Sequence, residues 1–146
     1  MNRPETIAAL LKSQSTLALA TVGEDAAARV TPLFYLADDD LRLYWFSSAA
    51  SAHSKSLRRN PAAALTVYCP AESWKEIRGV QMRGAAAAVS DRARRRVIAE
   101  AYAERFRLGR VLRAGMARSS LYSFEPAWVR YMDNSRGFGY RFEMKL

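Results

Sequence analysis

The chain is poor in the residues that build disulfides and metal sites. Among its 146 residues there is one cysteine, Cys69, and one histidine, His53. A lone cysteine cannot form an internal disulfide, and a single Cys/His pair cannot supply the four ligands of an ordinary zinc site. We therefore expect no metal centre and a cytoplasmic location, with the fold held by its hydrophobic core.

Long apolar runs are missing as well. No segment approaches the roughly 18 consecutive apolar residues that a membrane-spanning helix requires. The N-terminus, Met1 to Glu5, has an acid near its start and no apolar signal segment follows it. The sequence thus predicts neither secretion nor a membrane partner.

The length fits one domain over residues 1–146, and no linker or internal repeat divides it. Its 23 lysines and arginines outnumber 14 acids, which gives a net charge of +9. Such a balance suits nucleic acids, membrane headgroups or anionic metabolites. The cations are dispersed, apart from a cluster at Arg92–Arg96, and a GC-rich genome would also produce an arginine- and alanine-rich chain. Charge alone does not select a partner, and we do not expect nucleic acid.

Apolar periodicity predicts short helices and several strands. The helices are expected at 5–12, at 51–59 and after Asp91, and the strands at 17–22, 28–36, 41–46, 62–68, 77–89 and on both sides of the turn at 133–137. The first three strands, joined by short turns, predict a meander. Gly79 and Gly84 inside one long strand indicate a bulge or bend. Without a repeated strand–helix–strand order, the pattern predicts a mainly β, α+β fold: an antiparallel split barrel of six to seven strands with short flanking helices.

The segment from Trp45 to Pro61 carries the first functional signal. An apolar strand enters a serine-rich turn that opens a short basic helix. Free amide groups and the helix dipole favour an anion at such a position, and the hydroxyls of Ser47, Ser48 and Ser51 add donors. A phosphorylated small molecule is the ligand that this pattern suggests. The alternative is that Ser51 only caps a surface helix.

Several motifs agree in order and spacing with those of a known family. They are Arg29–Phe34, Phe46-Ser47 with Ser51–His53, Asn60-Pro61, and Arg78-Gly79-Val80 followed by Gly84–Ala86. Together they resemble the FMN-binding split-barrel superfamily typified by pyridoxamine 5'-phosphate oxidase. The strings at 77–81 and 133–139 are also similar to those of the uncharacterised YhbP-like branch of that superfamily.

The resemblance implies site residues as well as a fold. It places Arg29 and Ser47 at the FMN ribityl phosphate, makes Ser51 a further donor, and lays Val30, Thr31, Pro32 and Leu33 along the flavin ring. Pro32 suits an edge strand, where its missing N–H is not needed. The remaining predicted cofactor contacts are Ser48, His53, Lys55, Arg58, Arg78, Gly79, Gln81 and Asn134.

Three positions depart from the family pattern. The oxidases have lysine where this chain has His53, some have arginine where it has Ala52, and they have a flavin-contacting glutamine where it has Gly79. Two fixed cations are therefore absent from the phosphate site. Lys55 and Arg58, about one helical turn from His53, could replace them.

The leading hypothesis is a homodimeric FMN-dependent oxidoreductase that acts on an unidentified small molecule. FMN is expected rather than FAD because no dinucleotide-binding motif is present. No residue pattern indicates a catalytic triad. Two alternatives stay open: a non-catalytic flavin, haem or anion-binding module, and a polyanion-binding basic protein. Related split barrels also bind haem or the deazaflavin F420, and His53 is the one imidazole that could ligate haem iron.

Overall fold

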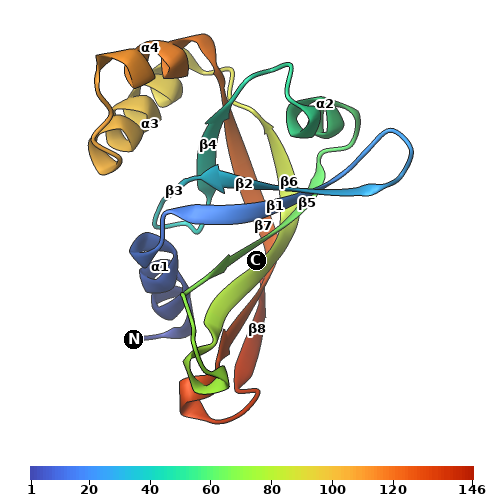
Figure 1. Ribbon diagram of the computed structural model, residues 1–146, viewed down its shortest axis with the longest axis vertical. Coiled ribbons are helices and arrows are strands. Elements are labelled where there is room, and N and C mark those ends of the chain that lie inside the picture. Colours follow the sequence, from blue (N-terminus) through green and yellow to red (C-terminus); the bar gives the residue numbers. More distant parts are fainter.

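A computed structural model describes all 146 residues, and its eight strands form one antiparallel sheet that curls strongly on itself (Figure 1). The strands are β1 (Thr16–Val22), β2 (Ala28–Phe34), β3 (Leu36–Ala37), β4 (Leu43–Ser47), β5 (Ala62–Tyr68), β6 (Arg78–Ala88), β7 (Ser120–Asp133) and β8 (Arg141–Lys145). Their order is β2-β1-β5-β6-β7-β4-β3, and β8 pairs with β7. The predicted antiparallel split barrel is confirmed. The strand number reaches eight because the short β3 separates from β2 and pairs with β4.

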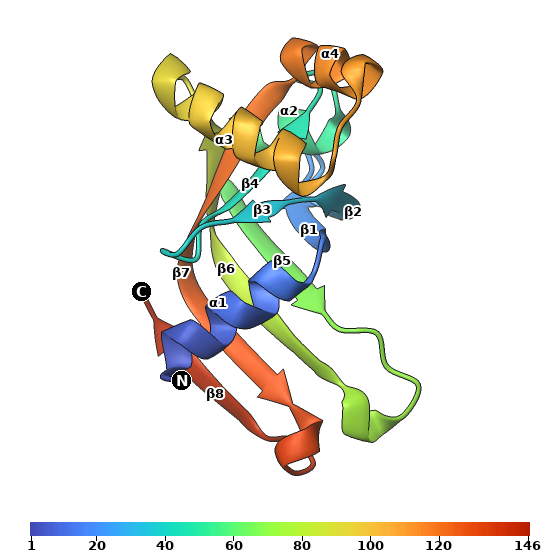
Figure 2. The same cartoon turned by 90° about the vertical axis from the view of Figure 1, so that its left-hand side faces the viewer.

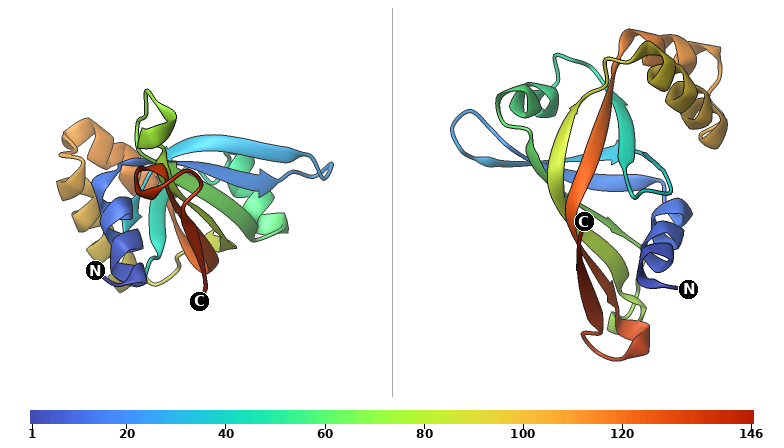
Figure 3. Two further views of the ribbon diagram at one scale, coloured as in Figure 1. Left: turned by 90° about the horizontal axis from the view of Figure 1, so that it is seen from below. Right: turned by 180° about the vertical axis from the view of Figure 1, so that it is seen from behind.

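Four helices flank the sheet: α1 (Arg3–Ser13), α2 (Ala52–Arg59), α3 (Arg92–Arg105) and α4 (Arg110–Arg118). Helix α1 crosses the sheet, whereas α2, α3 and α4 gather at one end of the molecule (Figure 2). Two 3-10 turns, η1 (Trp74–Glu76) and η2 (Asn134–Arg136), lie at the opposite end (Figure 3). The longest helix, α3, has 14 residues, and none of the four has the length and apolarity that crossing a membrane requires.

The predicted meander of the first three strands is only half right. Strands β1 and β2 form the expected hairpin, with Leu17 opposite Leu33. Strand β4 does not join this hairpin, because it pairs with the first part of β7, more than 70 residues later in the sequence. The meander prediction was wrong because local alternation identifies a strand but does not identify its partner.

Alternation along β1 sets the two faces of the sheet near the site. Leu17, Leu19 and Thr21 are buried, whereas Ala18 and Ala20 between them are only half-buried. The buried side joins the main core, to which α1 adds an apolar face. Strand β2 has no partner on its far side, so Pro32 stands on an edge strand as its missing N–H predicts.

The bend predicted in the long strand is also present. Pairing between β6 and β7 shifts register between Arg83 and Gly84. A Cβ atom at Gly84 would clash with the backbone of Glu125, so the close approach of the two strands requires glycine. This bulge curves the sheet into its half-barrel shape.

The α3–α4 region differs from the sequence prediction in two ways. Helix α3 starts after Asp91, as predicted, but Val97, expected on its packed face, is 67% exposed. Helix α4 was not predicted, and no residue of it is buried. The sequence of α4 is amphipathic, with Leu112 and Met116 four residues apart, so this periodicity was available and was missed.

Candidate functional site

Basic side chains converge beside α2 on a concavity of about 520 Å³, which we name the cationic hollow. Arg29 enters it from β2, and three cations enter from α2. A single carboxylate, Glu24, lines the hollow and lies 3.2 Å from Arg59. The complete lining is Glu24, Arg29, Ala52, Lys55, Ser56, Arg58 and Arg59. Four cations against one acid give the hollow a net positive lining, which favours an anion.

A second cavity of about 350 Å³, the inner pocket, adjoins the hollow because the two share Arg29 and Ala52. Its other lining residues are Thr21, Val30, Thr31 and His53. Thr21 and Arg29 stand opposite each other in the β1–β2 register, so their side chains share a face of the sheet. The inner pocket contains no carboxylate, and Arg29 links it to the cationic hollow.

The serine-rich turn is built differently from the sequence-based expectation. Nε2 of His53 lies 2.8 Å from Oγ of Ser47 and 3.2 Å from Oγ of Ser51. Ser51 is also the N-cap of α2, since its hydroxyl accepts the N–H of Ser54. Oγ of Ser48 accepts the N–H of Ala50. The three hydroxyls predicted to face a phosphate therefore already have partners within the chain.

His53 is half-buried between this serine cluster and the inner pocket. Burial lowers the pKa of its imidazole below the usual value of 6.5. The side chain is consequently neutral at neutral pH in the free protein. The permanent positive charge at the inner pocket therefore belongs to Arg29. His53, which stands where the oxidases have lysine, does not supply it.

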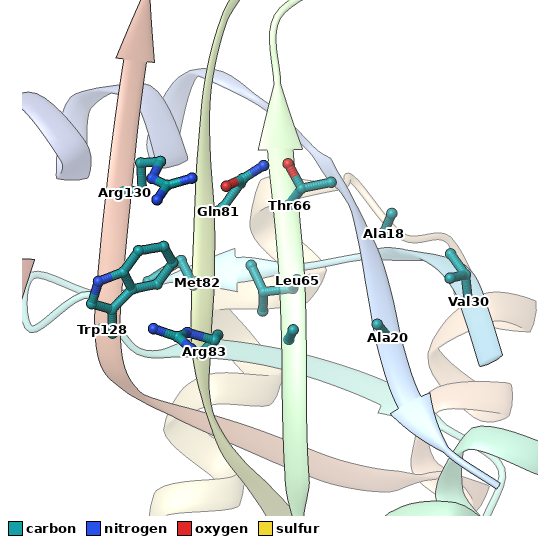
Figure 4. Close-up of a pocket in the computed structure, with 11 residues that line it drawn as sticks. Ala18, Ala20, Val30, Leu65, Thr66, Gln81, Met82, Arg83, Trp128 and Arg130 are labelled. Carbon is teal, nitrogen blue, oxygen red and sulfur yellow. The ribbon is translucent and has the colours of Figure 1, made fainter. Parts of the chain in front are cut away.

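A third concavity of about 530 Å³, the outer groove, runs along the sheet (Figure 4). Its wall is mostly apolar and includes Ala18, Ala20 and Val30 of the β1–β2 hairpin. On its other side, the guanidinium carbons of Arg83 and Arg130 lie 4.3 and 5.2 Å from the ring centre of Trp128. Gln81 points into the same groove (Figure 4). Val30 lines both the outer groove and the inner pocket, so β2 forms the boundary between these two cavities.

Three predicted cofactor contacts belong to the start of β6 and to η2, at the end of the molecule opposite α2 (Figure 1). They are Arg78, Gly79 and Asn134. Nη2 of Arg78 is 3.6 Å from Sγ of Cys69. Asn134 uses its amide within the fold, donating to the carbonyl of Trp74 and accepting from the N–H of Gly139. A Cβ atom at Gly79 would lie 2.7 Å from the carbonyl oxygen of Val67, which explains why no glutamine stands there. One chain does not bring these residues to the cationic hollow.

The structure also adds residues that the sequence reasoning missed. Arg59 and Glu24 line the cationic hollow, and Thr21 lines the inner pocket. Arg59 follows Lys55 at helical spacing, and this spacing was available in the sequence. Thr21 has the same parity in β1 as two buried leucines, which could have identified it as a buried polar residue.

Comparison with protein families gives one match of nearly full length. Residues 4–133 match the sequence profile of the pyridoxamine 5'-phosphate oxidase family, so the chain belongs to that family. No curated protein matches the sequence.

Solved structures agree on the fold. The conserved hypothetical protein Rv2991 from Mycobacterium tuberculosis has a TM-score of 0.81 at 22% identity, covering 100% of this chain and 92% of that one. The haem storage protein HutZ from Vibrio cholerae has a TM-score of 0.71 at 17% identity, covering 86% and 91%. A haem-binding protein from Mycobacterium smegmatis has a TM-score of 0.82 at 14% identity, covering 99% and 58%. At these identities the comparisons show a shared fold.

Proposed function

We propose that this member of the pyridoxamine 5'-phosphate oxidase family binds FMN, with the phosphate at the junction of the cationic hollow and the inner pocket. One observation carries the proposal: Arg29, at this junction, and Lys55, Arg58 and Arg59 line the hollow against a single carboxylate. A phosphate monoester carries about −1.5 to −2 charges at neutral pH and is stabilised by such a group of donors. FAD is disfavoured because no dinucleotide-binding motif accompanies the site.

The open edge of β2 suits the flavin ring. Its outward backbone groups have no neighbouring strand, so they are free to bind the polar edge of a flat ligand. Val30 and Pro32 add apolar contact, while Arg29 and Thr31 line the inner pocket together with His53 of α2. Bound flavin would supply electron or hydride transfer, and the residues of β2 would bind and orient it. The proposed activity is therefore that of an oxidoreductase acting on a small molecule.

We include a homodimer in the proposal. The outer groove is mostly apolar and lies next to β2, where a second copy would cover it and enclose the ring site. Trp128 is the aromatic anchor of this surface. Sedimentation equilibrium at micromolar concentration should give twice the chain mass of 16.4 kDa, and a stable monomer would remove the dimer from the proposal.

Haem is the competing cofactor because structural neighbours of this chain include a haem-binding and a haem storage protein. The one imidazole of this chain is His53, and its Nε2 is engaged by Ser47 and Ser51. Ligation of iron through that nitrogen would break both contacts and leave the buried hydroxyl of Ser47 to find a new partner, whereas Ser51 would keep its bonds to Ser48 and Ser54. This cost favours a flavin over haem.

The visible spectrum of the freshly purified protein tests the proposal. Flavin absorption, with FMN identified by chromatography after heat release, is the expected result. For protein purified without cofactor, titration with FMN should quench flavin fluorescence at a stoichiometry of one per chain. A haem spectrum, release of FAD, or failure to bind added FMN would each overturn the assignment.

A further inference from the structure

Two buried polar atoms lack a hydrogen-bond partner within the protein, the side-chain oxygen Oγ1 of Thr21 and the ring nitrogen Nε1 of Trp45. Trp45 lies in the core, stacked against Tyr122, and lines none of the three concavities described above. Thr21 differs because it is 3% exposed and yet lines the inner pocket. A buried hydroxyl without a partner destabilises the protein that carries it. A ligand group in the inner pocket would supply the missing partner.

The neighbours of Thr21 define the chemistry of that ligand group. Arg29 stands directly opposite it in the β1–β2 register, and His53 approaches from α2. The nearest acid to Arg29 is Asp25, at 3.9 Å across an exposed surface, so the guanidinium is free to bind an anion. A hydroxyl donor and a guanidinium on paired residues, with no carboxylate in the lining, match an oxyanion.

We propose that Thr21 donates its hydroxyl proton to an oxygen of the phosphate that binds beside Arg29. The inference rests on the proposed function and adds a contact to the same ligand. It makes Thr21 a specificity-determining residue, because the hydrogen bond distinguishes a phosphorylated flavin from riboflavin. It also gives a reason for threonine at a position where β1 otherwise buries leucine.

Substitution of Thr21 by valine tests this contact, because valine preserves the branched shape and removes the hydroxyl. Fluorescence titration of Thr21→Val should show FMN affinity reduced about tenfold to a hundredfold and riboflavin affinity unchanged. Thr21→Ser keeps the donor and should bind FMN within about threefold of the unmodified chain. Thr16→Val, at the exposed start of the same strand, is the matched control and should leave both affinities unchanged.

Thermal unfolding separates a lost contact from a damaged fold. Without ligand, Thr21→Val should unfold at the same temperature as the unmodified chain or higher, because an unpartnered hydroxyl has been removed. Unchanged FMN affinity in Thr21→Val would overturn the inference and leave the proposed function standing. Equal losses of FMN and riboflavin would also overturn it, since Thr21 would then act through packing.

If the unmodified chain does not bind FMN, the proposed function fails and inorganic phosphate becomes the probe. A larger phosphate-induced rise in unfolding temperature for the unmodified chain than for Thr21→Val would still support the Thr21 contact. Equal rises would overturn it.

Discussion

The two basic regions of this molecule, the cationic hollow and the α3–α4 segment, differ in what their arginines do. Between Arg92 and Arg118, nine arginines stand against two glutamates, so this segment carries +7 of the net charge of +9. The cationic hollow gathers only four cations and one acid. A count of charges alone would select α3–α4 as the anion site. That segment also has a cavity of about 290 Å³ lined by Arg92, Arg95 and Arg96, so the two regions are distinguished by what their arginines contact.

Two arginines of α3 are used to hold the fold together. Arg95 donates to the carbonyl oxygens of Met116 and Ser119, at the end of α4, and its guanidinium lies over the ring of Phe46. Arg94 donates to the hydroxyl of Tyr44 and lies over its ring. In the hollow only part of the charge is used in this way. Arg58 donates to the carbonyl oxygen of Ala49, and Arg59 pairs with Glu24. Lys55 makes no hydrogen bond or ion pair, and Arg29 only approaches the exposed Asp25 at 3.9 Å. Net charge determines a long-range field, whereas a binding site needs free charges that converge on a cavity.

The largest expected effect is that of Arg29→Ala on FMN binding. Arg29 lines both the cationic hollow and the inner pocket, and loss of a charge-assisted contact to phosphate costs roughly 1.5–3 kcal/mol. FMN affinity should therefore fall about tenfold to a hundredfold at physiological salt. Fluorescence titration measures the affinity, and circular dichroism checks that the variant folds. An affinity within twofold of the unmodified chain would mean that the general positive field, and not Arg29, holds the phosphate.

Arg29 also shows how far the sequence reasoning reached. Its motif predicted the residue that joins the two cavities, and alternation predicted that β2 and its neighbours are strands. Ser47 and Ser51 were predicted as phosphate donors from their place in the chain. Chain order alone cannot show that the imidazole of His53 contacts both hydroxyls. Thr21 was missed because its importance depends on which face of β1 meets α2.

A second, smaller effect is expected for Arg95→Ala, and it should fall on stability. The substitution removes the hydrogen bonds that Arg95 makes to the end of α4 and its stacking on Phe46. Each such bond contributes on the order of 1 kcal/mol, so the unfolding temperature should fall by several degrees. Amide hydrogen exchange should quicken across α4, which buries no side chain that would hold it otherwise.

FMN affinity of Arg95→Ala should stay within about twofold of the unmodified chain, since Arg95 does not line the hollow or the inner pocket. A loss comparable to that of Arg29→Ala, with α4 still protected from exchange, would show that α3 belongs to the flavin site. The structural role of Arg95 could not be predicted from the sequence, because a cluster of arginines at the start of a helix has the same pattern whether its side chains are solvated or hydrogen-bonded.

The two regions should also differ in their response to pH. Burial lowers the pKa of His53 in the folded chain below its value in the unfolded chain. The unfolded state therefore binds more protons as the pH falls, so the stabilising contribution is complete above about pH 6.5 and is lost as pH drops through the lowered pKa. Arginine stays charged over this pH range, so the contacts of Arg94 and Arg95 in α3 do not make stability depend on pH.

His53→Gln isolates this effect because glutamine does not titrate. The decrease in unfolding temperature between pH 7.5 and pH 5.5 should be smaller in this variant than in the unmodified chain. Arg95→Ala should keep the full decrease, although it starts from a lower temperature. An unchanged pH dependence in His53→Gln would mean that the neutral imidazole does not contribute to the stability of the serine cluster.

The smallest effect is expected for the double variant Arg92→Ala with Arg110→Ala, which removes two exposed charges from the α3–α4 segment. Such charges interact with a ligand beside Arg29 only through solvent, where screening acts over about 8 Å at physiological salt. FMN affinity should change by less than about twofold at that salt concentration. At low salt the loss should increase modestly and then disappear as salt is added back.

Equal losses for this variant and for Arg29→Ala, both abolished by salt, would mean that the general positive field holds the flavin and would support the polyanion-binding alternative. A deficit in Arg29→Ala that persists at high salt would instead assign the binding energy to the hollow and the inner pocket.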